Sequence, residues 1–357
     1  MIERNTQPKK YLLFVSLPYA FPVLRPVQDA IRQRENCEVA WFVEEPYAHY
    51  LKNDERRLRS VAEVMDYNPM AVLVVDNKVY DFFPGIKVQL FHGFNIHKRI
   101  SPSYNGHFNI RGLFDLYCTQ GENTTPEFER LSNLKGHFKA YETGWPKIDA
   151  LFKDYPNEEV VLKPSSRPCI LYTSTFTKGI TSTPYLYDEI KRLITSREWD
   201  WLITFHPKMD RETVEKYKQL AQYDNVIFYE GDNNIPLLKR ADVMICDSSS
   251  IIIEFQMQNK PVVTFKNTHP GDYLIDIDDP ALLEQSIEKA LSPSEELLRS
   301  IRKNSDILNP YRDGKSSERV LDAIDWFLEN HYGKLKRKPL NLVRKLQLRW
   351  KLKYFHF

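Results

Sequence analysis

Four segments of this sequence place histidines, hydroxyls and cations directly after apolar runs of strand length. They are LFHGFNIHKR (90–99), TSTFTKG (173–179), TFHPKMD (204–210) and ICDSSSIIIEF (245–255). A histidine at such a position can take a proton from an attacking hydroxyl near neutral pH, and lysines or N–H groups at a helix start can hold a phosphate. These residue types therefore indicate chemistry on an anionic substrate.

The first segment contains a candidate general base. His92 ends the apolar run, and Gly93 after it allows the backbone to turn sharply. His97, Lys98 and Arg99 follow and could hold an anionic donor or acceptor. A single histidine at a strand end is often structural, so the spacing alone leaves a structural and a catalytic role for His92 open.

Two further segments end strands with groups suited to an anion. In TSTFTKG the hydroxyls of Thr173 and Thr175 precede a lysine and a glycine, but the spacing departs from the GxxxxGK[ST] phosphate loop. In TFHPKMD, His206 ends a strand, Pro207 stops its ladder and Lys208 stands alongside. The two threonines, His206 and Lys208 are candidate donor-binding groups, and a purely structural role for each stays open.

The fourth segment carries more hydroxyls than a helix start needs. A buried strand ends before Asp247, and a helix-period run begins after Ser250, which we expect to be the N-cap. The capping box is absent because Glu254 lies four positions after Ser250 instead of three. Ser248 and Ser249 are therefore candidate anion ligands, whereas Asp247 would repel phosphate and is expected to shape the turn.

The elements that must position these residues alternate along the chain. Apolar, strand-like runs are expected at 11–17, 39–45, 70–76, 87–93, 113–121 and 138–144, and again at 169–175, 200–207, 225–231, 242–248 and 260–266. Helix-period segments separate most of them. This alternation predicts an α/β protein with mostly parallel, doubly wound sheets, in which ligands bind at the carboxyl ends of the strands.

A polar, proline-bearing stretch interrupts this alternation and divides the chain. We expect a Rossmann-like first domain over 1–152, a linker over 153–168, a second Rossmann-like domain over 169–333 and a basic tail over 334–357. With 357 residues, 42% of them hydrophobic, the chain is long enough for two cores. Its four cysteines are widely separated, which indicates buried thiols rather than disulfides or a metal site.

The tail has a composition of its own. Residues 334–357 contain nine lysines or arginines and no acidic residue, although the whole chain has a net charge of +2. Apolar side chains recur there at helical spacing among the cations: Leu342, Val343, Leu346, Trp350 and Phe355. This pattern predicts a basic amphipathic helix on an anionic membrane surface. The alternatives are a terminal helix packed on the body and, less favoured because the body is acidic, nucleic-acid binding.

The motifs also occur together in a specific order. An HG turn in the first half is followed by GWPKID (144–149), by an HP strand end (206–207), and by a DSSS turn (247–250) that precedes NKPVV (259–263). This combination, over about residues 10–330, resembles the CDP-glycerol glycerophosphotransferase family, the teichoic-acid primases and polymerases. The resemblance implies the two-domain fold of type-B glycosyltransferases.

The resemblance also implies roles for single residues. His92 stands at the candidate base of the family's WHGTPLKK-like motif, with Lys98 near its lysines. His206 matches the HP histidine associated with the donor pyrophosphate, and residues 247–249 match the SDYSS turn of the donor-phosphate site. The segment 144–149 matches GYPRND. Phe-Asn-Ile replaces the family's Thr-Pro-Leu, and the arginine of its PTWR-like strand end is absent.

The implied reaction is a transfer of glycerol phosphate or another polyol phosphate. An acceptor hydroxyl, deprotonated by His92, would attack the β-phosphorus of a CDP-glycerol or CDP-polyol donor and expel CMP, while His206, Lys208 and the turn at 248–250 stabilise the pyrophosphate. The acceptor would be a lipid-linked or surface glycan of teichoic-acid or capsule synthesis. The enzyme would be cytoplasmic and peripheral on the inner face of the membrane, held there by residues 334–357.

We expect no metal and no other cofactor, because no DxD-like pair ends a strand. The acidic run of Asp276, Asp278 and Asp279 is interpreted as a turn. Two other functions stay open. A glycosyltransferase or a UDP-N-acetylglucosamine 2-epimerase-like enzyme of the same fold would use Glu254 and a UDP-linked substrate. A non-catalytic glycan-assembly factor would use neither histidine.

Overall fold

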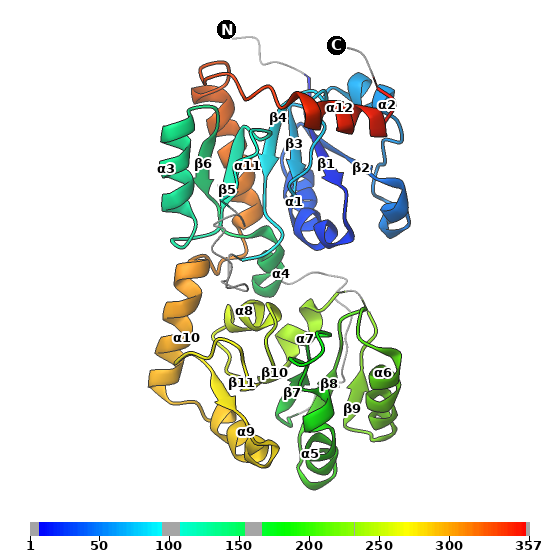
Figure 1. Cartoon of the computed structure of the whole chain (residues 1–357), viewed down its shortest axis with the longest axis vertical. Helices are drawn as coiled ribbons and strands as arrows, with labels where there is room; N and C mark the ends of the chain where they lie inside the picture. The colour runs from blue at the N-terminus through cyan, green and yellow to red at the C-terminus, as the bar shows by residue number, and fades with distance from the viewer. Residues whose placement is uncertain (1–6, 95–107, 154–165, 232, 355–357) are drawn as a thin grey trace. The chain divides into compact units, whose positions relative to one another are not determined.

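The structure is a computed structural model that describes residues 7–94, 108–153, 166–231 and 233–354. The chain forms two units (Figure 1). Unit 1 comprises residues 1–149 and 308–357, and unit 2 comprises residues 150–307. Each is an α/β unit built on one parallel sheet of six strands, which confirms the predicted fold class.

The sheet of unit 1 has the strand order β2-β1-β3-β4-β5-β6. Its strands are β1 (Lys9–Val15), β2 (Cys37–Val43), β3 (Ala71–Val74), β4 (Ile86–Gln89), β5 (Leu116–Thr119) and β6 (Lys139–Glu142). The order reverses between β1 and β3. In doubly wound sheets, the carboxyl ends of the strands at such a reversal border the crevice that binds ligands.

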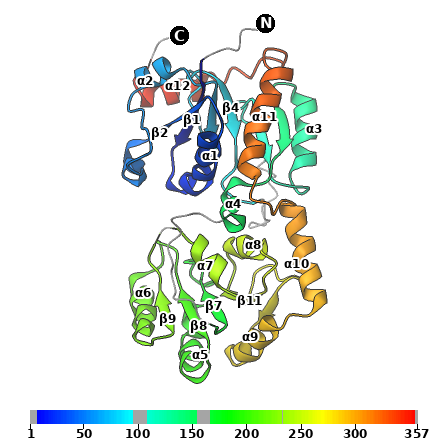
Figure 2. The same cartoon turned by 180° about the vertical axis from the view of Figure 1, so that it is seen from behind.

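Helices cover both faces of this sheet. They are α1 (Phe21–Gln33), α2 (Val61–Tyr67), α3 (Thr125–Lys135), α11 (Ser316–Asn330) and α12 (Leu342–Lys351). The short helix α4 (Asp149–Phe152) spans the point in the chain where unit 1 ends and unit 2 begins. Figure 2 shows α1 and α11 side by side on one face. The aromatic core of the opposite face contains Phe14, Phe42, Tyr117 and Phe128. Leu348 of α12 and Leu352, directly after that helix, pack against it.

The expected domain boundary at residue 333 differs from the structure, because α11 belongs to unit 1. Its Trp326 contacts Tyr141 of β6, with ring centroids 5.2 Å apart. Its Asp325 forms ion pairs with Lys9 (2.7 Å) and Arg34 (3.2 Å). Sequence position placed this helix with the preceding strands, whereas its contacts join it to the first sheet.

The sheet of unit 2 has the strand order β12-β11-β10-β7-β8-β9. Its strands are β7 (Cys169–Tyr172), β8 (Asp200–Ile203), β9 (Val226–Phe228), β10 (Val243–Cys246), β11 (Val262–Phe265) and β12 (Ile275–Ile277). Its helices are α5 (Thr183–Ser196), α6 (Arg211–Lys218), α7 (Ile235–Arg240), α8 (Ile251–Gln256), α9 (Leu283–Leu291) and α10 (Glu295–Leu308). Here the order reverses between β7 and β10, so the loops after these two strands lie at the expected ligand edge.

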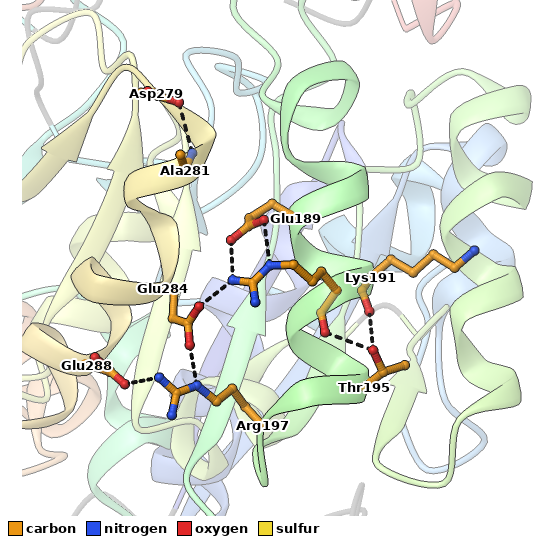
Figure 3. Close-up of polar contacts among 9 residues, drawn as sticks. Glu189, Lys191, Thr195, Arg197, Asp279, Ala281, Glu284 and Glu288 are labelled. Carbon is orange, nitrogen blue, oxygen red and sulfur yellow. Dashed lines mark hydrogen bonds and ion pairs between the residues drawn. The ribbon is translucent and has the colours of Figure 1, made fainter.

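The acidic run at 276–279 is not simply a turn, because Asp276 lies in the edge strand β12. Its carboxylate accepts hydrogen bonds from the Thr264 hydroxyl (2.6 Å) and the Asn267 N–H (3.0 Å). Asp279 instead caps a short 3-10 helix by accepting from the Ala281 N–H at 2.9 Å (Figure 3). Both carboxylates thus have structural partners.

Figure 3 also shows an ion-pair network between α5 and α9. Glu284 of α9 pairs with Arg192 of α5 and with Arg197, and Arg197 also pairs with Glu288. These side chains are 25% to 48% exposed and reach solvent, so the network adds little to stability. It lies on the helical layer and contributes no residue to the strand-end loops.

Three of the four cysteines are buried in strands, and all four are free thiols. Burial raises the pKa of Cys169 to about 12, so this thiol stays protonated. No helix in the described ranges is both long enough and apolar enough to cross a bilayer.

Candidate functional site

Asp247 joins the loops that follow β7 and β10. Its carboxylate is completely buried and accepts hydrogen bonds from the backbone N–H groups of Thr175 (2.9 Å), Ser182 (3.0 Å) and Ser248 (2.7 Å). The hydroxyls of Ser174 and Ser182 donate to the same carboxylate. Because these donors enclose it, Asp247 shapes the two loops and presents no charge to a ligand.

The two candidate threonines of the β7 loop differ in exposure. Thr173 is buried, and its N–H donates to the carbonyl of Ile245 at 3.0 Å, so it continues the pairing of β7 with β10. Thr175 is partly exposed, and only its backbone N–H is used by Asp247. Of these two residues, Thr175 is therefore the one whose hydroxyl a ligand can reach.

Ser250 occupies the N-cap position of α8 but does not cap it. Its backbone is already helical, with φ −69° and ψ −16°, and its side chain makes no cap hydrogen bond. The expectation that Ser250 is the plain cap is wrong, because a capping side chain needs an extended backbone to reach the first N–H groups. The Ser248 hydroxyl accepts from the Thr268 N–H at 2.9 Å, while no hydrogen bond of the Ser249 or Ser250 side chain occurs within the described ranges.

His206 has a defined tautomer. It is exposed after β8, and its Nδ1 accepts a hydrogen bond from the Lys208 N–H at 3.0 Å. Burial of part of the ring and the nearby Lys208 cation lower the pKa of His206. The neutral imidazole therefore carries its proton on Nε2, which makes Nε2–H a hydrogen-bond donor, while Lys208 supplies positive charge.

Phe176 connects the β7 loop to His206, and the sequence motifs had not identified it. The Phe176 and His206 ring centroids lie 4.6 Å apart, and Lys208 Nζ lies 5.7 Å from the Phe176 ring. A single aromatic residue among the hydroxyls of TSTFTKG is the signal that could have drawn attention to it. Through Asp247 and Phe176, the loops after β7, β8 and β10 form one edge with hydroxyl, imidazole and ammonium groups, which can bind a phosphate.

In unit 1, His92 lies exposed after β4. Its ring contacts Tyr19, with centroids 5.3 Å apart. The sharp turn predicted at Gly93 occurs two residues earlier, because Phe91, with φ +60°, has the left-handed backbone and Gly93 does not. The other candidates of this segment, His97, Lys98 and Arg99, lie outside the described residues.

Asp76 is a titratable group that the motifs did not identify. It follows β3 beside the reversal of strand order, and it accepts hydrogen bonds from the Ser16 hydroxyl and from the Lys78 N–H (2.8 Å). Burial raises the pKa of Asp76 to about 6. Burial and the nearby Asp76 raise the pKa of Tyr19 to about 12, so Tyr19 is a neutral phenol beside His92. An acid at the end of the run MAVLVVD was the available sequence signal.

Asp76 makes stability depend on pH. The folded-state pKa of about 6 lies above the ordinary value of 3.8, so the folded protein binds this proton more tightly than the unfolded chain does. The resulting stabilisation is complete below about pH 4 and is lost as the pH rises through about 6. We expect Asp76→Asn to raise the free energy of unfolding by about 1 to 3 kcal/mol near neutral pH and to change it little near pH 4.

Urea denaturation over this pH range measures the effect, with the exposed Asp66→Asn in the same unit as a control. If Asp76→Asn changed the free energy of unfolding equally at pH 4 and near neutral pH, the raised pKa of Asp76 would be contradicted.

The GWPKID segment is a structural element of unit 1. Gly144 has φ +76°, and a Cβ there would lie 2.7 Å from Ser316 Oγ and 2.8 Å from Tyr311 Cδ2. Asp149 caps α11 by accepting from the N–H groups of Ser316 (2.9 Å) and Ser317 (2.7 Å). The segment therefore joins β6 to α11. These contacts could not be predicted from the local sequence, because α11 lies more than 160 residues further along the chain.

Lys260 of the NKPVV segment is likewise structural. Its ammonium donates to the carbonyls of Leu238 (3.1 Å), Lys239 (2.7 Å) and Ala241 (2.8 Å) at the end of α7. Burial lowers the pKa of Lys260 to about 8. The cation thus satisfies carbonyls at a helix C-terminus.

Comparisons with known proteins bear on this arrangement. The Teichoic acid poly(ribitol-phosphate) polymerase of Bacillus spizizenii is 23% identical over 346 residues, which cover 83% of this chain and 52% of that protein. The chain therefore spans about half the length of this curated relative.

Two solved structures show the same two-sheet fold. The structure of the Wall Teichoic Acid Polymerase TagF has a TM-score of 0.64 at 14% identity, covering 92% of this chain and 91% of that one. A UDP-N-acetylglucosamine 2-epimerase has a TM-score of 0.59 at 17% identity, covering 93% and 98%. At these identities the likeness shows the fold of type-B glycosyltransferases and nothing about the reaction.

The family itself is shown by a model match along the sequence. Residues 25–325 match the family described as CDP-Glycerol:Poly(glycerophosphate) glycerophosphotransferase. This range includes the HG turn, the GWPKID segment, the HP strand end and the DSSS turn, so the match covers every motif on which the resemblance depended. The chain belongs to the CDP-glycerol glycerophosphotransferase family.

Proposed function

We propose that this protein transfers glycerol phosphate, or a related polyol phosphate, from a CDP-linked donor to a hydroxyl of a lipid-linked or surface glycan, with release of CMP. Family membership over residues 25–325 is the observation that carries the proposal. The strand-end loops of unit 2 support it, because they combine the donors and the positive charge that a pyrophosphate requires.

The donor pyrophosphate is assigned to the loops after β7, β8 and β10. His206 donates its Nε2–H, Lys208 supplies a full positive charge, and the Thr175 hydroxyl adds a donor. Ser249 and Ser250 contribute hydroxyls beside the first N–H groups of α8. Asp247 holds these groups in place without touching the substrate, since its oxygens are occupied by loop donors.

The acceptor is assigned to the His92 turn of unit 1. His92 takes the proton of the acceptor hydroxyl as its oxygen attacks the β-phosphorus. The bond from that phosphorus to the oxygen bridging to CMP breaks, and CMP leaves with the electron pair. Acceptor binding is also proposed for Gly93 and, as a role that follows from the sequence, for His97, Lys98 and Arg99. The chain's own groups provide positioning and charge stabilisation throughout.

One experiment tests the reaction class. The full chain is incubated with CDP-glycerol, CDP-ribitol or UDP-linked sugars in the presence of a lipid-linked glycan acceptor, and the released nucleotide is measured. Release of CMP that depends on the acceptor is expected. Release of UDP from a UDP-sugar, or an acceptor-independent change of the sugar, would support the epimerase-like alternative, whose fold this chain shares. Glycan binding without release of any nucleotide would support an assembly factor.

The membrane is the proposed location of the acceptor, and α12 is the proposed contact. Five apolar side chains of this region are exposed in the structure: Leu340, Leu342, Val343, Leu346 and Trp350. Their opposite side is held to unit 1, since Arg349 donates to Asp81 (3.1 Å) and Lys351 to Glu44 (2.6 Å). Packing on unit 1 and binding to a membrane are therefore compatible, because they would use different faces of α12. A cytoplasmic, peripheral enzyme on the inner membrane face follows as the proposed setting.

Single substitutions test this contact better than removal of residues 334–357. The tail also contains Lys338, which pairs with Asp115 (2.7 Å), and Tyr354, which stacks on Phe82 with centroids 4.4 Å apart. Its deletion would therefore uncover the core of unit 1.

Trp350→Glu should lower binding to vesicles of anionic phospholipid by roughly tenfold or more, because it replaces an exposed indole with a charge of the wrong sign. Gln347→Glu makes the same charge change at an exposed position outside the apolar stripe and serves as the matched control. Cosedimentation measures both variants. If both variants lost vesicle binding equally, the contact would depend on charge alone and not on the exposed indole. If Trp350→Glu lost no vesicle binding, the proposed membrane contact would be refuted.

A further inference from the structure

The residue before His92 has an unusual backbone. Phe91 has φ +60°, in the left-handed region that large side chains rarely adopt. Such a conformation costs on the order of 1–3 kcal/mol and persists only where surrounding contacts impose it. The contacts that hold Phe91 therefore also determine the direction in which the chain presents His92.

Trp145 makes contacts on both sides of the His92–Gly93 turn. Its indole Nε1–H donates to the carbonyl of Phe91 at 3.2 Å. Its ring packs against Phe94, with centroids 4.9 Å apart and an interplanar angle of 67°. The indole, only 2% exposed, thus touches the residue before His92 and the second residue after it.

Trp145 is itself anchored in the core of unit 1. Its backbone N–H donates to Oδ1 of Asn309 at 2.9 Å, and Asn309 is completely buried. The amide of Asn309 in turn donates to the carbonyl of Tyr311 at 2.6 Å. The indole therefore has a fixed position from which to hold a turn whose own imidazole is exposed.

We propose that Trp145 is a positioning residue for His92, and that this is the role of the second residue of the GWPKID segment. The proposal rests on the proposed function of His92 as a base. A base works only when its nitrogen lies within hydrogen-bond reach of the acceptor hydroxyl, and a displacement of about 1 Å can cost about a hundredfold in rate. Trp145 touches no substrate; it acts through the Phe91 carbonyl and the Phe94 ring.

The experiment compares Trp145→Phe with Trp41→Phe. Phenylalanine keeps an aromatic ring at 145 but removes the N–H that holds Phe91. Trp41 is a matched control, because it is also buried in unit 1 and its Nε1–H also donates one hydrogen bond, to Gln28 at 2.5 Å. Both variants should lose a similar amount of stability in urea denaturation.

Only Trp145→Phe should lower kcat for transfer, by roughly tenfold to a hundredfold, while KM for the donor stays within about twofold. It should also shift the NMR signal and titration of the His92 imidazole, assigned by its absence in His92→Gln. Trp41→Phe should leave kcat and the His92 signal unchanged. Identical kcat and His92 signals in the two variants would overturn the proposal.

A second variant covers the case in which Trp145→Phe does not fold. Phe94→Leu keeps an apolar side chain but removes the ring contact with Trp145, and it should shift the His92 signal in the same direction. An unchanged His92 signal in this variant would then count against the proposal. If the wild-type protein turned over no CDP-linked donor, the proposed function would be refuted. The effect of Trp145 on the His92 signal could still be tested, because the NMR measurement needs no substrate.

Discussion

Replacing His92 with glutamine should lower the rate of phosphoryl transfer by about 10²–10⁴-fold, the usual contribution of a general base. Glutamine keeps the polarity and approximate size of the side chain but cannot take a proton. The donor is assigned to the loops of unit 2, so its binding constant should change by no more than about twofold. Acceptor-dependent CMP release and calorimetric titration with the donor measure the two quantities separately.

The control for this variant is His49→Gln. His49 is also an exposed histidine of unit 1, in the 3-10 helix Glu45–Tyr50, and no motif includes it. Its replacement should leave both the rate and the donor affinity unchanged. If His92→Gln retained a rate close to that of His49→Gln, the base would have to be another group. Asp76, whose pKa burial raises to about 6, would be the next candidate to examine in unit 1.

The second large effect is expected at Asp247. Asp247→Asn replaces one carboxylate oxygen with an amide that faces the N–H groups of Thr175, Ser182 and Ser248. Buried donors that lose a charged acceptor destabilise a protein strongly, so we expect a loss of about 2 to 5 kcal/mol in the free energy of unfolding. The loops should also lose their shape, and donor affinity should fall by roughly a hundredfold.

Asp242→Asn provides the comparison on the same strand. Asp242 precedes β10, whereas Asp247 follows it, and its carboxylate accepts from the Cys169 N–H at 2.8 Å. This variant removes a carboxylate at the opposite edge of the sheet, so donor affinity should be unchanged. Calorimetric titration and urea denaturation of both variants check the expectation. If Asp247→Asn bound the donor as tightly as the wild-type protein does, the β7 and β10 loops would not be the donor-phosphate site.

Most of the secondary structure follows from local patterns in the sequence. The apolar runs at 11–17 and 169–175 predicted strands that the structure has as β1 (Lys9–Val15) and β7 (Cys169–Tyr172), and the helices show a 3.6-residue period, so each can be recognised without knowing its partners. β12 was missed, because a three-residue edge strand that contains Asp276 has neither signal. The order of strands and the return of α11 to unit 1 depend on contacts such as that of Trp326 with Tyr141, which are distant in sequence.

The tail forms the predicted amphipathic helix, and one face of it packs on the body. The sequence pattern predicted an amphipathic helix, with packing on the body as the alternative. In the structure Leu348 and Leu352 face the core while Leu346 and Trp350 are exposed. Periodicity identifies apolar positions on a helix, but only the shape of the neighbouring surface decides which of them become buried.

The α/β class, the family and the candidate residues at the strand ends, including His92, His206 and Asp247, could all be predicted from the sequence, because they depend on short spacings and on motif order. The contacts that these residues make with one another could not be predicted, because they join segments that are distant in sequence. Asp247 meets Ser174 across 73 positions, and Trp145 meets Phe91 across 54. The buried Asp76 and the aromatic contact of Phe176 with His206 arise in the same way. Hydrogen bonds and ring contacts of this kind form between chain segments that the sheets bring together, so local patterns in the sequence cannot predict them.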